Sequence, residues 1–463
     1  MSVKKDLLNV DQALQLEREE VKKNYKDYVN PGLLRMFSLL NFDKKYEKAE
    51  GVRLWDSDGE EYLDFLGGFG ALNLGHNPTA VLRAVEKVEE LPNILQTAMG
   101  TMTSAAARNL AQITPGDLSH TFFGNSGTEA VEGALKLARA ASGKSKIVYT
   151  EGSFHGKTMG SLSITGRSKY QKPFSPLMPA SEKVPYGDVE ALKAKLKYNE
   201  IAAFIVEPIQ GEAGIILPPE GYLREIRELC DEYDTYLIFD EIQTGLGRTG
   251  QLFACEAEET VPDIMCLAKS LGGGVMPVGA FITTEKIWNK AFGGINKALL
   301  HTSTFGGNTR ATAAVIAAVN QIIEDDLSQQ AKQKGNYLLS RLKELAAKYE
   351  MIEDVRGRGL MVGLEFKQPK EGMLDKISQG MFSKLSHEYL GSLVAGTLLN
   401  DYQIITAYTL NNPNVIRLEP PLVVSYDQMD KLIDALDEIF DKYDSVFSVA
   451  VNSAKNVISG IFK

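Results

Sequence analysis

Through the middle of the chain, short apolar runs alternate with stretches whose apolar residues recur at helical spacing, such as residues 221–233. The runs that predict strands are residues 147–151, 203–207, 236–240, 264–268 and 278–283. Strands that alternate with helices in this way indicate an α/β domain built on a mostly parallel sheet. We expect this large domain to span residues 76–334, with a sheet of the seven-stranded type.

The segment before the large domain has a different pattern. Residues 6–28 are charged and periodic, which predicts a surface helix, and Asn30-Pro31-Gly32 would end it. Residues 52–65 alternate in polarity around Asp58-Gly59, which predicts a β-hairpin. We expect residues 1–75 to form a helix and a hairpin that belong to a small domain.

The segment after the large domain changes character again. Residues 310–350 predict one long helix, and beyond about residue 335 the strand-like residues 359–366 and 415–418 alternate with helices such as 426–443. We expect residues 335–463 to form a smaller α+β domain. The amphipathic tail at residues 445–463 receives no function.

Composition excludes several classes of protein. The 463 residues carry a net charge of -10 without a basic block, which argues against a nucleic-acid surface. No apolar window reaches the roughly 18 residues of a membrane-spanning helix, and no signal peptide is visible, so we expect a cytoplasmic enzyme. Cys230, Cys255 and Cys266 are far apart, and the histidines are well separated, so we expect buried thiols and no metal site.

Two of the predicted strands end on residues that carry chemistry. The run at 236–240 ends on Asp240, with Glu241 next, and the run at 264–268 is followed by Lys269. The C-terminal tips of parallel strands face the crevice where ligands bind. A desolvated lysine there is a nucleophile toward a carbonyl, and an aspartate can keep a ring nitrogen protonated. This pair matches the needs of pyridoxal 5′-phosphate (PLP).

Two further motifs fit a phosphorylated, planar ligand. Residues 124–129, Gly-Asn-Ser-Gly-Thr-Glu, precede a predicted helix, with Ser126 and Glu129 spaced as a capping box. Such a turn is either an anion site or a plain helix cap. Phe154 follows a strand and could stack on a ring or only pack in the core, and His155 could be a structural histidine. Nothing pairs His155 with a nucleophile, so a hydrolase triad is not expected.

Taken together, several motifs resemble the class III (ω-) aminotransferases over roughly residues 35–445. The matching blocks are residues 124–129, 154–156, 207–212, 240–250, 267–269 and 304–308. Within this class the chain looks like the bacterial putrescine aminotransferases, on residues 66–70, 267–277 and 394–398. The resemblance implies a PLP fold type I homodimer with active sites shared between subunits, and tetramers remain open.

The resemblance also implies a role for each motif residue. Lys269 would bond to the cofactor aldehyde and Asp240 would hold the ring nitrogen protonated. The other residues implied in cofactor binding are Ser126, Gly127 and Thr128 for the phosphate, Phe154 and His155 at the ring, Gln243 at the ring hydroxyl, and Thr304 from the other subunit. Glu212 and Arg417 would form the family's switch pair, in which Arg417 binds the α-carboxylate of 2-oxoglutarate.

The donor predicted from this resemblance is a diamine such as putrescine or cadaverine. Ornithine aminotransferases usually carry tyrosine where Phe69 stands and arginine where Lys157 stands, and these groups grip the α-carboxylate of ornithine. Their absence favours a donor without that carboxylate. An ornithine 5-aminotransferase or a 4-aminobutyrate-type ω-aminotransferase remains the alternative, followed by a PLP mutase or decarboxylase and then a catalytically silent binding protein.

Overall fold

A seven-stranded sheet forms the centre of the molecule. The computed structural model describes residues 7–95, 97–198, 200–367 and 381–443. The strands, in the order β4-β10-β9-β8-β7-β5-β6, are β4 (Leu118–Gly124), β10 (Gly279–Thr284), β9 (Ile264–Leu267), β8 (Tyr236–Asp240), β7 (Ile201–Val206), β5 (Lys146–Thr150) and β6 (Ser181–Val184). β10 pairs antiparallel with both of its neighbours, whereas β9, β8, β7, β5 and β6 pair in parallel. The predicted α/β class with a mostly parallel sheet is confirmed.

The apolar runs are continuous because the sheet is buried on both faces. In β8, Ile238 belongs to the core under α7 (Gly127–Ser142), whereas Leu237 and Phe239 belong to the core on the other face, with α11 (Tyr222–Glu232). Alternate residues of a strand point to opposite faces, so both sets must be apolar. A strand buried on both faces can present polar groups only at its tip.

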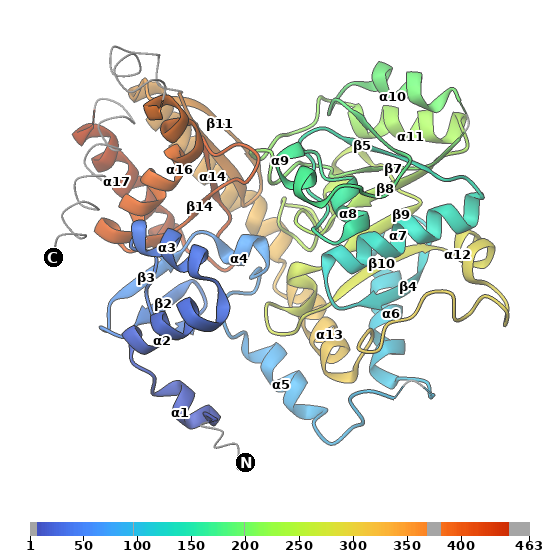
Figure 1. Cartoon of the computed structure of the whole chain (residues 1–463), viewed down its shortest axis with the longest axis horizontal. Helices are drawn as coiled ribbons and strands as arrows, with labels where there is room; N and C mark the ends of the chain where they lie inside the picture. Colours follow the sequence, from blue (N-terminus) through green and yellow to red (C-terminus); the bar gives the residue numbers. More distant parts are fainter. Residues whose placement is uncertain (1–6, 96, 199, 368–380, 444–463) are drawn as a thin grey trace.

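The remaining helices of this region surround the sheet (Figure 1). They are α5 (Thr79–Lys87), α6 (Thr101–Ile113), α8 (Met159–Ser163), α9 (Ser168–Gln171), α10 (Val189–Leu196), α12 (Glu285–Phe292) and α13 (Thr309–Glu324). The next helix, α14 (Leu327–Lys348), lies away from this sheet, beside β11 (Ile352–Arg358). The single helix predicted over residues 310–350 is wrong, because α13 and α14 are separate. Asp326 has φ +48°, in the left-handed region, which a continuing α-helix cannot contain.

Two smaller sheets lie on the other side of the molecule. β11 (Ile352–Arg358), β12 (Met361–Phe366), β15 (Val415–Leu418) and β14 (Ala407–Tyr408) form one of them, with α16 (Met381–Tyr402) and α17 (Tyr426–Lys442) nearby. β1 (Tyr46–Glu50), β2 (Arg53–Asp56), β3 (Glu61–Asp64) and β13 (Ile404–Ile405) form the other. The predicted hairpin is confirmed as β2–β3. In Figure 1 the blue N-terminal elements lie beside the orange and red C-terminal helices, and β3 pairs with β13. The domain boundaries stay a prediction.

The N-terminal helix differs from its prediction. Instead of one helix over residues 6–28, the structure has α1 (Val10–Leu14), α2 (Arg18–Asn24) and a π-helical turn at Tyr25–Val29. Asn30 is extended and its side chain caps α3 (Pro31–Leu39), so it starts a new helix where an end was expected. α1 and α2 bury no residue of their own.

Other predictions can be compared directly. Cys230, Cys255 and Cys266 are buried and free, as predicted. Among the described residues, no helix has the length and apolarity needed to cross a membrane. The tail at residues 445–463 lies outside the described residues.

Candidate active site

The tips of β8 and β9 bring Asp240 and Lys269 to one edge of the sheet. The two strands pair in parallel, with Asp240 opposite Cys266, and the Glu241 N–H donates to the Cys266 carbonyl at 3.0 Å. Lys269 follows two residues after β9 ends, at the first position of a 3₁₀ turn, Lys269–Gly272. The predicted convergence of the two side chains on one cavity is therefore present, because both line it.

Lys269 has an unusual backbone and an unusual environment. Its φ is +48°, a left-handed conformation that costs free energy in a non-glycine residue and tends to occur at functional sites. Burial lowers the pKa of the Lys269 amine, although the carboxylates of Glu419 and Glu212 oppose that shift. The amine therefore has an increased neutral, nucleophilic fraction.

Asp240 is held by two hydrogen bonds. Its Oδ2 atom lies 2.7 Å from Nδ1 of His155, and its Oδ1 atom accepts from the Ile242 N–H at 3.1 Å. Asp240 and His155 are both buried. Among the described residues, Nε2 of His155 has no hydrogen-bond partner. Because the carboxylate is fixed in this way, it can accept a hydrogen bond from a protonated ring nitrogen only when the ring lies in one orientation.

The N-terminus of α7 forms another wall of the cavity. Ser126 is the N-cap and accepts from the Glu129 N–H at 3.3 Å, and Gly127 and Thr128 begin the helix. The first N–H groups of a helix lack helical acceptors and favour an anion. The reciprocal half of the predicted capping box is wrong, because the Glu129 carboxylate accepts from the Asn125 N–H and not from Ser126.

Gly156 lies against this helix start. Its φ is +122°, which L side chains rarely adopt, and a Cβ atom there would collide with the Thr128 and Ser161 side chains. Those two hydroxyls lie 2.7 Å apart. A side chain at position 156 would therefore push Thr128 away from the cavity.

Most of the predicted site residues meet in one cavity of about 340 Å³. Those that line it are Ser126, Gly127, Thr128, Phe154, His155, Glu212, Asp240, Gln243 and Lys269. Thr304 does not: it is exposed in the single chain and lines a second depression with Gly306, Gly307 and residues 91–95 and 98–103. Its assignment to the other subunit's site stays a prediction.

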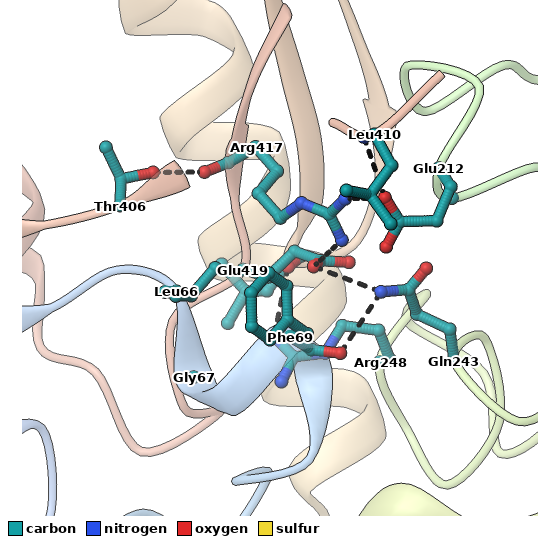
Figure 2. Close-up of polar contacts among 12 residues, drawn as sticks. Leu66, Gly67, Phe69, Glu212, Gln243, Arg248, Thr406, Leu410, Arg417 and Glu419 are labelled. Carbon is teal, nitrogen blue, oxygen red and sulfur yellow. Dashed lines mark hydrogen bonds and ion pairs between the residues drawn. The ribbon is translucent and has the colours of Figure 1, made fainter. Parts of the chain in front are cut away.

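Arg417 lies behind the cavity wall, on β15, and is fully buried (Figure 2). Its Nη2 atom lies 2.5 Å from Oε2 of Glu212, and its Nη1 atom lies 3.4 Å from Oε2 of Glu419. Burial alone would lower the pKa of Arg417, but the Glu212 and Glu419 carboxylates outweigh it and raise that pKa. Burial alone would raise the pKa of Glu212, but the positive charge of Arg417 outweighs burial and lowers that pKa.

Phe69 and Gln243 contact Arg417 and Glu419, respectively. Phe69 has φ +59° within Gly67–Gly70, and its ring centroid lies 5.3 Å from the Arg417 guanidinium carbon. The Gln243 amide nitrogen donates to the Phe69 carbonyl at 3.1 Å and to Glu419 Oε2 at 3.2 Å. Lys157, by contrast, is exposed, and its Nζ atom lies 4.9 Å from the centroid of the Tyr170 ring.

The sequence-based prediction missed two buried acids. Glu419 is two residues after Arg417, a spacing that puts both side chains on one face of a strand, so its contact with Arg417 could have been anticipated. Glu207 lines the cavity and accepts from the N–H groups of Phe154 and Gly211 at 2.9 and 3.1 Å. It ends a predicted strand, as Asp240 does, and that position was the available signal.

Comparison with known proteins identifies the family. The family model for aminotransferase class III matches residues 39–440. The chain belongs to the class III aminotransferases. This class III aminotransferase is 37% identical over 457 residues to the aminotransferase PigE of Serratia sp. (strain ATCC 39006). That match covers 92% of this chain and 54% of PigE, so the chain spans about half the length of that relative.

Solved structures of other proteins are similar to this aminotransferase over most of its chain. The ornithine aminotransferase of Toxoplasma gondii, with PLP partly occupying its active site, matches with a TM-score of 0.82 and 30% identity, over 96% of this chain and 97% of that one. A PLP-bound amine transaminase from an uncultivated Pseudomonas species matches with a TM-score of 0.76 and 27% identity, over 86% and 95% of the two chains.

These findings imply PLP as the cofactor, and the residues in the cavity fit it. Lys269 offers an amine of lowered pKa, Asp240 a fixed carboxylate, and α7 an anion-binding N-terminus. Aminotransferases take an amino group from an amine donor and pass it to a keto acid.

Proposed function

We propose that this aminotransferase transfers a terminal amino group from a diamine, such as putrescine or cadaverine, to 2-oxoglutarate. The products are an aminoaldehyde and glutamate, formed in two half-reactions at one site. The observation that carries the proposal is the buried pair of Arg417 and Glu212 at the cavity wall, with its shortest contact at 2.5 Å. A site in which a cavity-lining glutamate masks the arginine behind it suits a donor without an α-carboxylate.

The two half-reactions make opposite demands on Arg417. While the donor occupies the cavity, Glu212 satisfies the guanidinium, which would be costly to leave unpaired in a buried position. When 2-oxoglutarate enters, we propose that Glu212 turns away and that Arg417 binds the α-carboxylate through paired N–H groups. Glu212 lies in the loop that follows β7, where rotation of its side chain disturbs no strand.

The other cavity residues have proposed roles toward the reaction. PLP, when bound, supplies an electron sink for the amine-bearing carbon. Lys269 would hold the aldehyde of the cofactor, and its amine in the neutral form would be the base for a proton at the amine-bearing carbon. Asp240, oriented by His155, holds the proton on the ring nitrogen. Ser126, Gly127 and Thr128 bind the phosphate, Phe154 packs on the ring, and Gln243 binds the ring hydroxyl.

We further propose a homodimer, in which Thr304 of each subunit completes the phosphate site of the other. The exposure of Thr304 in the single chain, together with exposed apolar residues near it such as Met99 and Phe305, supports a covered surface there. The molecular mass in solution, measured by light scattering, tests the dimer and distinguishes it from a tetramer.

Ornithine is the second candidate donor. The solved relatives include the ornithine aminotransferase of Toxoplasma gondii, at 30% identity. Lys157, beside Tyr170 near the Phe154 ring, offers a cation that could pair with the α-carboxylate of ornithine. The departures at Phe69 and Lys157 favour the diamine, because lysine cannot form the two-pronged contact of arginine.

A donor panel tests the proposal. Putrescine, cadaverine, ornithine and 4-aminobutyrate are each supplied with 2-oxoglutarate, and glutamate formation is measured. In a parallel series pyruvate replaces 2-oxoglutarate, and alanine formation is measured. We expect the highest kcat/KM with putrescine or cadaverine. A higher kcat/KM with ornithine would replace the diamine assignment by the second candidate.

A further inference from the structure

Arg417 has two carboxylate partners, and they differ in position. Glu212 lines the cavity from a loop, whereas Glu419 lies behind Arg417 and is not part of the cavity wall. The two carboxylate oxygens of Glu212 differ in their hydrogen bonds. Oε2 accepts from Arg417 and from the Leu410 N–H, the latter at 2.9 Å. Among the described residues, Oε1 of Glu212 accepts no hydrogen bond. A cavity-lining carboxylate oxygen therefore remains available to a ligand.

Glu419 is held at the end of the strand that carries Arg417. It directly follows β15, its N–H donates to the Phe65 carbonyl at 2.8 Å, and its Oε2 accepts from Gln243 as well as from Arg417. Figure 2 shows this arrangement, with Arg417 between the two acids and Gln243 reaching Glu419. Glu419 is fully buried, so its charge is not dispersed by water.

The charges of this group do not cancel. Two carboxylates share one guanidinium, which leaves one net negative charge on Glu212, Arg417 and Glu419 together. Arg248 is the other fully buried arginine in the region, and its N–H groups go to the Leu360 and Pro420 carbonyls and to Asn73. The Lys269 amine also lies near both acids, whose charges oppose the lowering of its pKa by burial. Neither Arg248 nor Lys269 makes a direct contact with Glu419 among the described residues, so both reduce this charge only from a distance.

We propose that Glu419 is a positioning residue that selects donors carrying a second ammonium group. By holding one side of Arg417, it prevents the arginine from neutralising Glu212 completely. The second ammonium of the donor then binds at the open oxygen of Glu212 and supplies the missing positive charge. This inference rests on the proposed function and deepens it, because it names the charge that the far end of the donor must carry.

The consequence is a preference that can be measured with two donors of equal length. n-Pentylamine has the shape of putrescine, with a methyl group in place of the second ammonium. If the buried group consisted of Glu212 and Arg417 alone, their charges would cancel and little would distinguish the two amines. With Glu419 present, putrescine gains an ion contact in a buried site and n-pentylamine does not.

The test compares kcat/KM for putrescine and n-pentylamine in the holoenzyme and in Glu419→Gln. We expect the wild type to favour putrescine, and the variant to lose at least ~10-fold of that ratio, because the substitution removes a buried charge but keeps the side chain's shape. The loss should appear in KM for putrescine with kcat nearly unchanged, the pattern of an interaction made equally before and during reaction. Glu419→Asp retains the charge and should retain most of the ratio.

Two further variants serve as a control and as an independent test. Glu365→Gln removes a carboxylate that contacts Arg356 at 2.5 Å on β12, outside the cavity, and should leave the ratio intact. Glu212→Gln also brings the group to neutrality, so it should lower the ratio even if Glu419→Gln does not fold. A ratio unchanged in Glu419→Gln or in Glu212→Gln, or one lost equally in Glu419→Asp, would overturn the inference.

Failure of the proposed function looks different. It would appear in the wild type, as poor turnover of every diamine in the donor panel. Failure of the present inference would appear as a wild type that favours putrescine, with a preference that neutralising Glu419 leaves in place.

Discussion

The imidazole of His155 and the carboxylate of Asp240 are joined by a contact of 2.7 Å between Nδ1 and Oδ2, and both side chains are buried. They come from different strand ends: His155 follows β5, and Asp240 ends β8. The contact sets the orientation of the carboxylate, because the other oxygen is occupied by the Ile242 N–H. Asp240 is therefore presented to the cavity in one arrangement.

Replacing Asp240 by asparagine should reduce kcat strongly. Asparagine keeps the size of the side chain but cannot hold a proton on a ring nitrogen as a carboxylate does, and we expect a loss of about 10²–10⁴-fold, the range of a positioned acid or base. His155→Leu should cost less, since it loosens the carboxylate without removing it. Steady-state glutamate formation measures both, and equal rates in Asp240→Asn and wild type would refute the assigned role.

Replacing Lys269 by alanine should abolish steady-state turnover. The substitution removes both the amine that would bind the cofactor aldehyde and the proposed base, and no other lysine of the described residues lines the cavity. Wild-type PLP enzyme should also show a visible absorption band that changes on adding putrescine, and the variant should lack the band's covalent, borohydride-sensitive form. Lys157→Ala, outside the cavity lining, is the matched control. Turnover close to wild type in Lys269→Ala would contradict the assignment.

Arg417→Lys should separate the two half-reactions. Lysine keeps the positive charge that Glu212 and Glu419 require, so the buried acids stay compensated, but it cannot form the two-pronged contact with a carboxylate. We expect KM for 2-oxoglutarate to rise ~10-fold or more, while a single turnover with putrescine, followed by the cofactor's absorbance, stays near the wild-type rate. An unchanged KM would remove Arg417 from acceptor binding.

Elements of the large sheet were predictable from sequence because local pattern and tertiary context agree there. The run at 236–240 is apolar on both faces and ends on a charge, and it is β8 to the residue. The prediction failed where one backbone conformation decides the outcome. Asp326 divides one periodic stretch into α13 and α14, and nothing in hydrophobic spacing reports its positive φ.

Site residues on strand tips were predictable for the same reason, whereas contacts that depend on tertiary packing were not. Lys269 and Asp240 are adjacent because parallel strands end at one edge. Glu212 meets Arg417 only because a loop after β7 packs against β15, more than 200 positions further along the chain. Resemblance to a family suggested this contact, whereas the contact of Glu419 with Arg417 follows from their spacing of two residues along the chain.

Glu207 predicts how stability depends on pH. Burial raises the pKa of Glu207 to about 7, against the opposing effects of His155 and of the N–H groups of Phe154 and Gly211. The folded protein therefore keeps this carboxyl protonated at pH values where the unfolded chain, with an ordinary value of 4.5, has released the proton. Because the unfolded state binds fewer protons between these two values, this group makes stability fall as pH rises from about 4.5 to about 7.

Glu207→Gln should remove that dependence. A difference of two to three pKa units corresponds to roughly 3 kcal/mol, so the free energy of unfolding of the wild type should decline by up to that amount, relative to the variant, between pH 5 and pH 7.5. Denaturant unfolding of both holoenzymes across this range measures the difference, and Glu365→Gln, at a more exposed carboxylate, serves as the control. Glutamine can leave the Gly211 N–H without an acceptor, which lowers the variant's stability by a constant amount at every pH. The slope carries the prediction, and parallel curves for wild type and Glu207→Gln would show that Glu207 is ionised throughout.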